Sequence, residues 1–214
     1  MQPAVNDIRA LYRARAGRVD FLDVPELTYL VLPGTGAPES PAFAAAAETL
    51  AGLSATVRFI AHRRTGVAGR PMPLEALWWS EGGSARVDLV AALALGVTDV
   101  RAFDRSSWRW QAMIVQPPGI DEAAFEQAFA CARKNGLTRI DEVRLEAWCE
   151  GTVAQLAHAG SYSSAARAVA GLHDAIEGAG YRPSGRHHEI YLTDPRRTER
   201  DAMRMVLRRP VAAG

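Results

Sequence analysis

Apolar residues along this chain follow two periodicities, and the strands and helices they predict occur in the same order twice. Residues 27–32 form a short apolar run that predicts a strand, and a loop rich in Gly, Pro and Ser follows at 33–40. A helix is expected to begin at Pro41, because Ser40 is a good N-cap and proline is favoured at the first helical position. A further strand is expected at 73–79.

The second pass begins at Val143, where alternating apolar and polar residues predict a strand that continues to Ala159. A Gly-Ser-Tyr-Ser loop follows, then a helix with apolar residues at intervals of three and four, and then a strand at 187–192. A strand at 108–116 and a helix at 121–135 lie between the two passes. An internal duplication of strand–helix–strand–strand units explains this order most simply.

We therefore expect one α+β domain over residues 1–214. Its parts are a first unit at 19–116, the linking helix at 121–135 and a second unit at 143–211. Two such units are expected to pair their antiparallel sheets, stack their helices on one face and leave a cleft on the other. Residues 80–104 are expected to be an insertion whose apolar part covers that cleft.

The 187–192 strand carries the residues most indicative of chemistry. Alternation places His187, Glu189 and Tyr191 on one face and His188, with two apolar residues, on the other. We expect the second face to lie in a core and the first to face a ligand. A carboxylate beside aromatic rings can bind an organic cation or act as an acid or base.

Glu189 also has a purely structural alternative, which is an ion pair with Arg186, Arg196 or another arginine. Glu75 holds the equivalent place in the first unit and is likewise followed by aromatic residues. Two carboxylates in one cleft can divide the roles of acid and base between them. They can equally lie far apart or pair with arginines.

Four of the five tryptophans gather in two short predicted strands. Trp78 and Trp79 are neighbours that must face opposite sides, whereas Trp108 and Trp110 share a face. Core packing is the ordinary role of each ring. Four of them so close together favour an aromatic cage, because tryptophan stacks well on planar cations.

The composition excludes several classes of protein. The 25 basic and 24 acidic residues give a net charge of +1, so no overall field draws the chain to nucleic acid or to an anionic membrane. The arginines between 196 and 209 are interleaved with acidic residues and are expected on a solvated helix face. No signal-peptide pattern and no membrane-spanning apolar run is found, which predicts a cytoplasmic protein.

No metal and no organic cofactor is expected. His187 and His188 face opposite sides of a strand and cannot chelate one ion, and no Cys/His cluster supports them. The glycines at 34 and 36 lack the rest of a nucleotide-binding fingerprint, and no Gly-x-Ser-x-Gly elbow is present. Nucleotide chemistry and serine hydrolysis are therefore not predicted.

Four segments, taken in order, resemble a known family. They are MPLEALWW at 72–79, WRWQAMIVQP at 108–117, HAGSYS at 158–163 and GRHHEIYLTDPRRT at 185–198. The chain resembles the GyrI-like small-molecule-binding proteins, specifically the stand-alone members without a DNA-binding domain, from residue 19 to 211. The resemblance implies tandem βαββ modules of the SHS2 type with pseudo-twofold symmetry, and a central pocket for bulky, often cationic, aromatic compounds.

The resemblance also implies roles for individual residues. Glu189 matches a buried glutamate that meets the ligand's positive charge, and some stand-alone members hydrolyse the cyclopropane of DNA-alkylating compounds. On this hypothesis Glu189 activates water and Tyr162 donates to the developing oxyanion. The residues expected to line the pocket are Trp78, Trp79, Trp108, Trp110, Tyr191 and Glu75. The partner is then a planar aromatic or cationic small molecule, and a homodimer is left open.

A non-catalytic module that sequesters or senses such compounds is the alternative. The two classes differ in turnover, since a binding module leaves its ligand intact. The sequence departs from the family pattern at 160–162, which reads Gly-Ser-Tyr where the family has Gly-Pro-Tyr.

Overall fold

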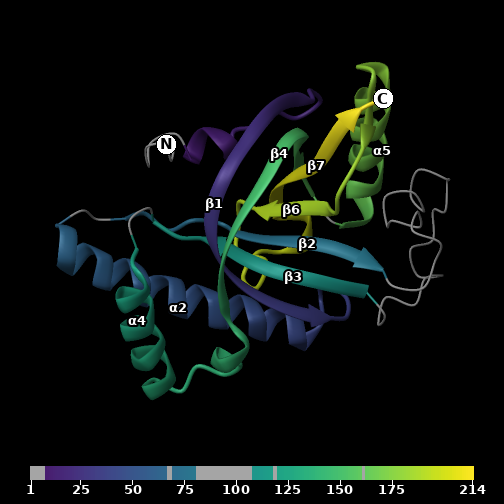
Figure 1. Ribbon diagram of the computed structural model, residues 1–214. Coiled ribbons are helices and arrows are strands. Elements are labelled where there is room, and N and C mark those ends of the chain that lie inside the picture. The colour runs from purple at the N-terminus through teal and green to yellow at the C-terminus, as the bar shows by residue number, and fades with distance from the viewer. Residues whose placement is uncertain (1–7, 67–68, 81–107, 118–119, 161) are drawn as a thin grey trace.

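The computed structural model describes residues 8–66, 69–80, 108–117, 120–160 and 162–214. These residues form an α+β protein with three α-helices and antiparallel strands (Figure 1). The helices and strands are β1 Asp20–Thr35, α2 Pro41–Thr65, β2 Leu74–Ser80, β3 Trp108–Val115, α4 Glu122–Lys134, β4 Arg144–Ala159, α5 Tyr162–Gly178, β5 Tyr181–Pro183, β6 His187–Tyr191 and β7 Arg204–Ala213. Short 3-10 turns lie at Arg9–Tyr12 (η1), Ile140–Glu142 (η4) and Arg200–Ala202 (η5).

The sheet closes on itself. Its strand order is β4-β1-β3-β2-β6-β7-β5, and β4 also pairs with β7. Closure is achieved by β1 and β4, which are 16 residues long. The first part of β4 pairs with β1, and from Val153 onward it pairs with β7. In Figure 1 the two long strands curve across β2, β3 and β6. The ring therefore has an outer face next to the helices and an inner face that the strands enclose.

Helix α2 covers the outer face and begins where the sequence predicts. The Ser40 hydroxyl accepts a hydrogen bond from the Phe43 backbone N–H at 3.2 Å, and Pro41 is the first helical residue. Helix α4 packs against α2, and α5 packs against β4 and β5. By length and composition α2 could cross a membrane, but half of its most apolar part is buried inside the protein. Core packing therefore accounts for its apolar character.

Gly34 is the position where β1 approaches a large buried ring. It pairs with Trp110 on β3, and a Cβ added to Gly34 would lie 2.2 Å from the Trp110 indole. Trp110 is fully buried, so the ring has no free space into which it can retreat. Only glycine fits at this position without a shift of the core.

Gly34→Ala is expected to lower the free energy of unfolding by about 1–3 kcal/mol, because overpacking forces buried side chains from their preferred rotamers. Denaturant unfolding followed by tryptophan fluorescence measures the change. Gly171→Ala on α5 is the matched control, since a Cβ there meets nothing within 4 Å. That control should be slightly stabilising, because alanine is the better helix former. Unchanged stability of Gly34→Ala would contradict the close contact.

The C-terminal arginines correct one expectation. Residues 204–213 form strand β7 instead of a solvated helix face, and Arg208 is buried with only 1% of its surface exposed. The arginines were assigned to solvent because acidic residues lie among them. The closed ring buries both faces of β7, so even a charged side chain at this position is enclosed.

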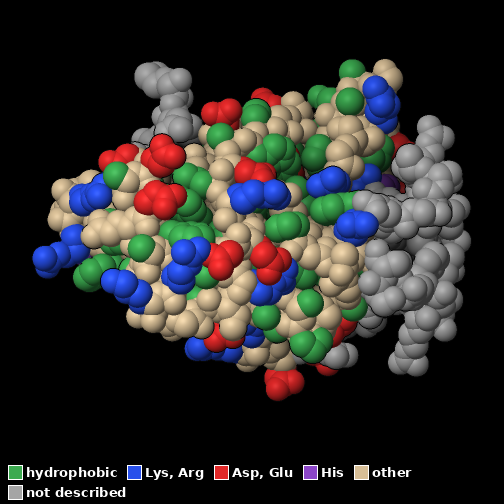
Figure 2. Space-filling model, turned by 60° about the horizontal axis from the view of Figure 1, so that its bottom comes forward, with side chains coloured by type: hydrophobic (Ala, Val, Ile, Leu, Met, Phe, Trp, Pro, Cys, Tyr) green, Lys and Arg blue, Asp and Glu red, His purple; other side chains and the backbone are tan. Residues whose placement is uncertain are grey.

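The α+β class with antiparallel strands is confirmed. The order β1, α2, β2, β3 is followed, after α4, by β4, α5, β5, β6 and β7. Pseudo-twofold symmetry and the SHS2 assignment remain predictions. The insertion expected at 80–104 lies, from residue 81 onward, outside the described residues. On the face shown in Figure 2, acidic and basic side chains are interspersed, as the balanced composition suggests.

Candidate functional site

Strand β6 has the two faces that its alternation predicts. The Tyr191 hydroxyl donates a hydrogen bond of 2.6 Å to Glu189 Oε2, and His187 Nε2 lies 3.5 Å from Glu189 Oε1. All three side chains are buried. His188 points to the opposite face, where it contacts Glu75. The prediction that Glu189 and Tyr191 share a face is confirmed.

An aromatic cluster on the outer face surrounds Tyr191. Phe43 on α2 lies between the rings of Trp78, Trp110 and Tyr191, with centroid distances of 5.1, 5.2 and 6.0 Å. Trp108 extends the cluster, since its ring centroid lies 6.2 Å from that of Trp78. The indole N–H groups of Trp78 and Trp110 have no hydrogen-bond partner among the described residues. Buried donors of this kind are rare in proteins.

Two other residues expected in the pocket, Trp79 and Tyr162, are not part of this cluster as described. Trp79 faces away from Trp78, and the Arg186 guanidinium lies 3.6 Å from the centre of its ring. Tyr162 is the first residue of α5, and its side chain lies outside the described residues. Arg196 is held by Asp194, so neither arginine named as an alternative partner contacts Glu189. Among the described residues, the basic side chain next to Glu189 is His187, at 3.5 Å.

Glu75 faces the inner side of the ring and not the side of Glu189. Glu75 pairs with Ile190 and Ala76 pairs with Glu189, so the two carboxylates lie on neighbouring strands but on opposite faces. Of the alternatives left open by the sequence, two carboxylates that share one face of the sheet do not occur. The inner carboxylate has its own tyrosine, because the Tyr12 hydroxyl donates to Glu75 Oε1 at 2.7 Å.

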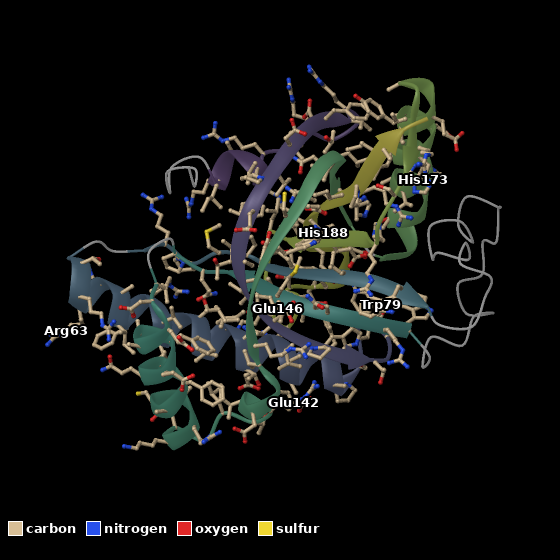
Figure 3. All side chains as sticks on the ribbon, in the orientation of Figure 1. Arg63, Trp79, Glu142, Glu146, His173 and His188 are labelled. Atoms are coloured by element: carbon tan, nitrogen blue, oxygen red, sulfur yellow. The ribbon has the colours of Figure 1, made fainter. Side chains whose placement is uncertain are left out.

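A buried ionic network continues inward from Glu75. His188 Nε2 lies 3.0 Å from Glu75 Oε2, and His188 Nδ1 lies 2.9 Å from Glu150 Oε1. Arg208 donates to Glu150 Oε2 at 3.1 Å and to the Gln155 side-chain oxygen at 2.8 and 2.9 Å. In Figure 3, His188 lies near the centre of the molecule, where β4 crosses β6. The face of β6 expected to be a plain apolar core therefore carries charge.

Mutual contacts set the protonation states of this network. Burial alone would lower the pKa of His188, but Glu150 and then Glu75 raise it to about 9. Burial would raise the pKa of Glu150, but His188 and Arg208 outweigh it and lower that pKa. Burial and the charge of Glu75 raise the pKa of Tyr12 well above 10, so its hydroxyl is protonated at neutral pH. His188 is accordingly an imidazolium.

Sequence analysis missed Glu150 because the alternation of β4 is interrupted at Gly151. Gly151 has a φ of 74°, in the left-handed region that favours glycine, and Val24 lies opposite it on β1. The register of β4 with β1 is the same on both sides of Gly151, so the side-chain direction changes without an inserted residue. As a result Glu150 and Gln155, five positions apart, both contact Arg208. The glycine is the signal in the sequence that indicates this break.

A cavity of about 640 Å³ lies where the ends of β2, β3 and β6 meet α2 and the η1 segment. Its apolar lining includes Ala47 and Ala51 of α2, and both Tyr12 and Tyr191 contribute to its wall. The cleft was expected on the face opposite the helices, but there the strands close and the ionic network fills the interior. Glu75 and Glu189 thus each lie one hydrogen bond behind a tyrosine of the same cavity.

The described side chains present no set of three or more His, Cys, Asp or Glu groups arranged to hold a metal ion. The adjacent histidines at 187 and 188 contact different glutamates on different faces of β6.

Solved structures with this fold include two proteins from Listeria innocua. An uncharacterized conserved protein is 27% identical, with a TM-score of 0.80, over 99% of this chain and 100% of that chain. A hydrolase is 28% identical, with a TM-score of 0.78, over 97% of each chain. The C-terminal domain of EcmrR, 11% identical with a TM-score of 0.52 over 92% of this chain and 98% of that one, shares the fold alone.

No curated protein matches the sequence. A family model does match, over residues 117–208, and that family is the GyrI-like small molecule binding domain. The matched region runs from the end of β3 to Arg208 and includes Glu150, His188 and Glu189. The resemblance predicted from the four motifs is therefore confirmed, since residues 117–208 match the GyrI-like small molecule binding domain.

Proposed function

We propose that the protein binds a bulky, planar organic compound in the 640 Å³ cavity and hydrolyses a strained ring of that compound, such as the cyclopropane of a DNA-alkylating agent. The observation that carries the proposal is the Tyr191–Glu189 pair, which places a buried carboxylate directly behind the cavity wall. The hydrolase from Listeria innocua, similar over nearly the whole chain, supports a hydrolytic reaction.

The cavity has the size and lining of a site for a drug-sized molecule. Such sites measure about 300–1,000 Å³ and combine apolar walls with a few polar groups. Here the apolar part includes Ala47, Met72 and Ile114, and the Tyr191 ring joins the wall to the aromatic cluster. The indole N–H groups of Trp78 and Trp110, which lack partners among the described residues, lie in that cluster behind the cavity wall, since neither residue lines the cavity. A planar ring system is the shape that such walls favour.

Glu189 is the base in the proposed reaction. A water oxygen forms a bond to a cyclopropane carbon, and the strained carbon–carbon bond breaks. Its electron pair moves through the conjugated ring to a carbonyl oxygen. Glu189 takes the proton of the water through the Tyr191 hydroxyl, which lies between Glu189 and the cavity, and later releases it to solvent. The new phenolate oxygen takes up one proton, so the product is the substrate plus one water. The tyrosine expected to meet the carbonyl oxygen is Tyr162, and the cavity itself offers Tyr12 and Tyr191.

The test is incubation of a spirocyclopropyl-dienone alkylator, in excess, with catalytic amounts of protein, followed by mass analysis. The expected product is heavier by one water, and Glu189→Gln should reduce turnover about 100-fold or more, as loss of a general base does. Glu177→Gln is the matched control, because Glu177 is exposed near the end of α5. It should leave turnover unchanged.

The outcomes separate catalysis from binding. Binding, detected by tryptophan quenching, with the alkylator unchanged would overturn hydrolysis and leave a module that sequesters or senses the compound. Full turnover by Glu189→Gln would show that Glu189 is not the base. Absence of both quenching and product would contradict the assignment of the cavity as the binding site.

A further inference from the structure

The η1 segment, residues 9–13, forms part of the cavity wall and is held there by the buried ionic network. The Arg208 guanidinium donates to the Leu11 backbone oxygen, and the Gln155 amide donates to the Arg13 backbone oxygen at 3.2 Å. The Tyr12 hydroxyl is fixed by Glu75. Hydrogen bonds with side chains of β7, β4 and β2 therefore fix the position of this segment.

The charges that this segment brings to the cavity are positive. Arg9 and Arg13 line the cavity, and neither makes an ion pair with any of the described residues. Asp194 also lines it, but its carboxylate is bound by Arg196 at 2.7 and 2.9 Å. Within the described lining, the arginine charges are therefore in excess.

The buried carboxylates do not reverse this sign. Glu75 is next to the His188 imidazolium at 3.0 Å, and Arg208 lies beyond it on Glu150. Glu189 is separated from the cavity by the Tyr191 hydroxyl, from which it accepts a hydrogen bond. A cationic ligand would thus meet guanidinium groups first, whereas an electron-rich oxygen would be attracted to Arg9 and Arg13.

We propose that Arg9 and Arg13 form a subsite for an electron-rich oxygen of the ligand, such as a carboxylate, a phenolate or a conjugated carbonyl. The inference rests on the proposed function, because it concerns the same cavity. It reverses the charge expected from the sequence, which favoured a cation. It also suits the proposed hydrolysis, in which negative charge develops on a carbonyl oxygen while Glu189 attracts the proton of the water.

Three anthracenes of nearly equal shape test the subsite: anthracene carboxylate, neutral anthracene methanol and cationic anthracene methylammonium. Fluorescence anisotropy of the anthracene reports binding to the full chain at neutral pH. The carboxylate is expected to bind most tightly, and Arg9→Gln/Arg13→Gln should weaken it about tenfold, as two partly screened charges would. The affinity of the neutral compound should change little.

Arg15→Gln/Arg18→Gln is the control pair, since both arginines are exposed, pair with Asp20 and lie outside the cavity lining.

Tighter binding of the ammonium compound, or an unchanged affinity for the carboxylate in Arg9→Gln/Arg13→Gln, would overturn the subsite and leave the proposed function standing. If none of the three anthracenes binds, both the subsite and the proposed binding of planar compounds in this cavity are wrong.

Discussion

Arg208→Met is expected to lower the free energy of unfolding by about 3–5 kcal/mol, the usual effect of removing one partner of a buried ion pair. Arg208 is 1% exposed and holds Glu150, Gln155 and the Leu11 backbone oxygen at once. Methionine has similar length and no charge, so the substitution removes these bonds without leaving a large cavity. The loss arises because Glu150 then keeps only His188 as a compensating charge.

Urea unfolding of purified variants measures this effect. Arg204→Met is the matched control, because Arg204 lies on the same strand and is exposed. Its stability should remain within about 0.5 kcal/mol of the wild type, as is usual for surface substitutions. The double variant Arg208→Met/Glu150→Gln should recover part of the loss, since the uncompensated carboxylate is gone. Similar stabilities for Arg208→Met and Arg204→Met would show that the network is not buried as described.

The local pattern of apolar, polar and capping residues was sufficient to predict most of the helices and strands. The N-cap at Ser40, the long strand ending at Ala159 and the short strand at 187–191 occur as expected. These features depend on residues close together in the chain, where side-chain type decides backbone conformation. The shared face of Tyr191 and Glu189 followed from alternation alone, and the structure adds the hydrogen bond between them.

Closure of the sheet was not predictable in the same way, and the errors follow from it. Pairing of β4 with β7 buries a face of β6 and β7 that an open sheet would leave to solvent or to a plain core. His188 and Arg208 face one another across these strands and are charged because Glu75 and Glu150 complete the network. Each residue alone resembles a surface residue. Their charges compensate one another only because β2, β4, β6 and β7, which are distant in the sequence, meet in the closed sheet.

Tyr12 shows that contacts between residues distant in the sequence also limited the prediction of the candidate site. It lies 63 positions from Glu75 in the sequence, in a segment with no clear periodicity, and was not considered as a site residue. Tyr162 was favoured because it belongs to a motif, whereas Tyr12 belongs to none. The tyrosines that line the cavity, Tyr12 and Tyr191, are identified by the closed sheet and α2, not by any motif.

The ionic network also predicts how stability depends on pH between 6.5 and 9. The pKa of His188 is raised from 6.5 to about 9 in the folded protein. Below pH 6.5 the folded and unfolded chains both carry the proton, so the stabilisation is fully present. As pH rises toward 9 the unfolded chain loses its proton first, and the stabilisation is lost. At 1.36 kcal/mol for each unit of pKa, the loss is about 3 kcal/mol.

At acidic pH, stability depends on pH with the opposite sign. The pKa of Glu150 is lowered from 4.5, so its contribution is present above 4.5 and is lost as pH falls. For these two groups together, stability should be greatest between pH 4.5 and 6.5. Tyr12 and Tyr29 have a pKa raised above 10, so they do not affect the slope between 6.5 and 9.

Urea unfolding at a series of pH values from 5 to 9 measures the wild-type slope, and His188→Gln should remove most of it. Where that variant does not fold, an NMR titration of the His188 ring in the wild type gives the same information. A ring that titrates near pH 6.5, or a stability that is flat from pH 6.5 to 9, would contradict the imidazolium. His188 would then be neutral between Glu75 and Glu150, and the inner face would carry net negative charge. In that case Glu75 would lack its compensating charge and would offset the positive charge that Arg9 and Arg13 bring to the cavity wall.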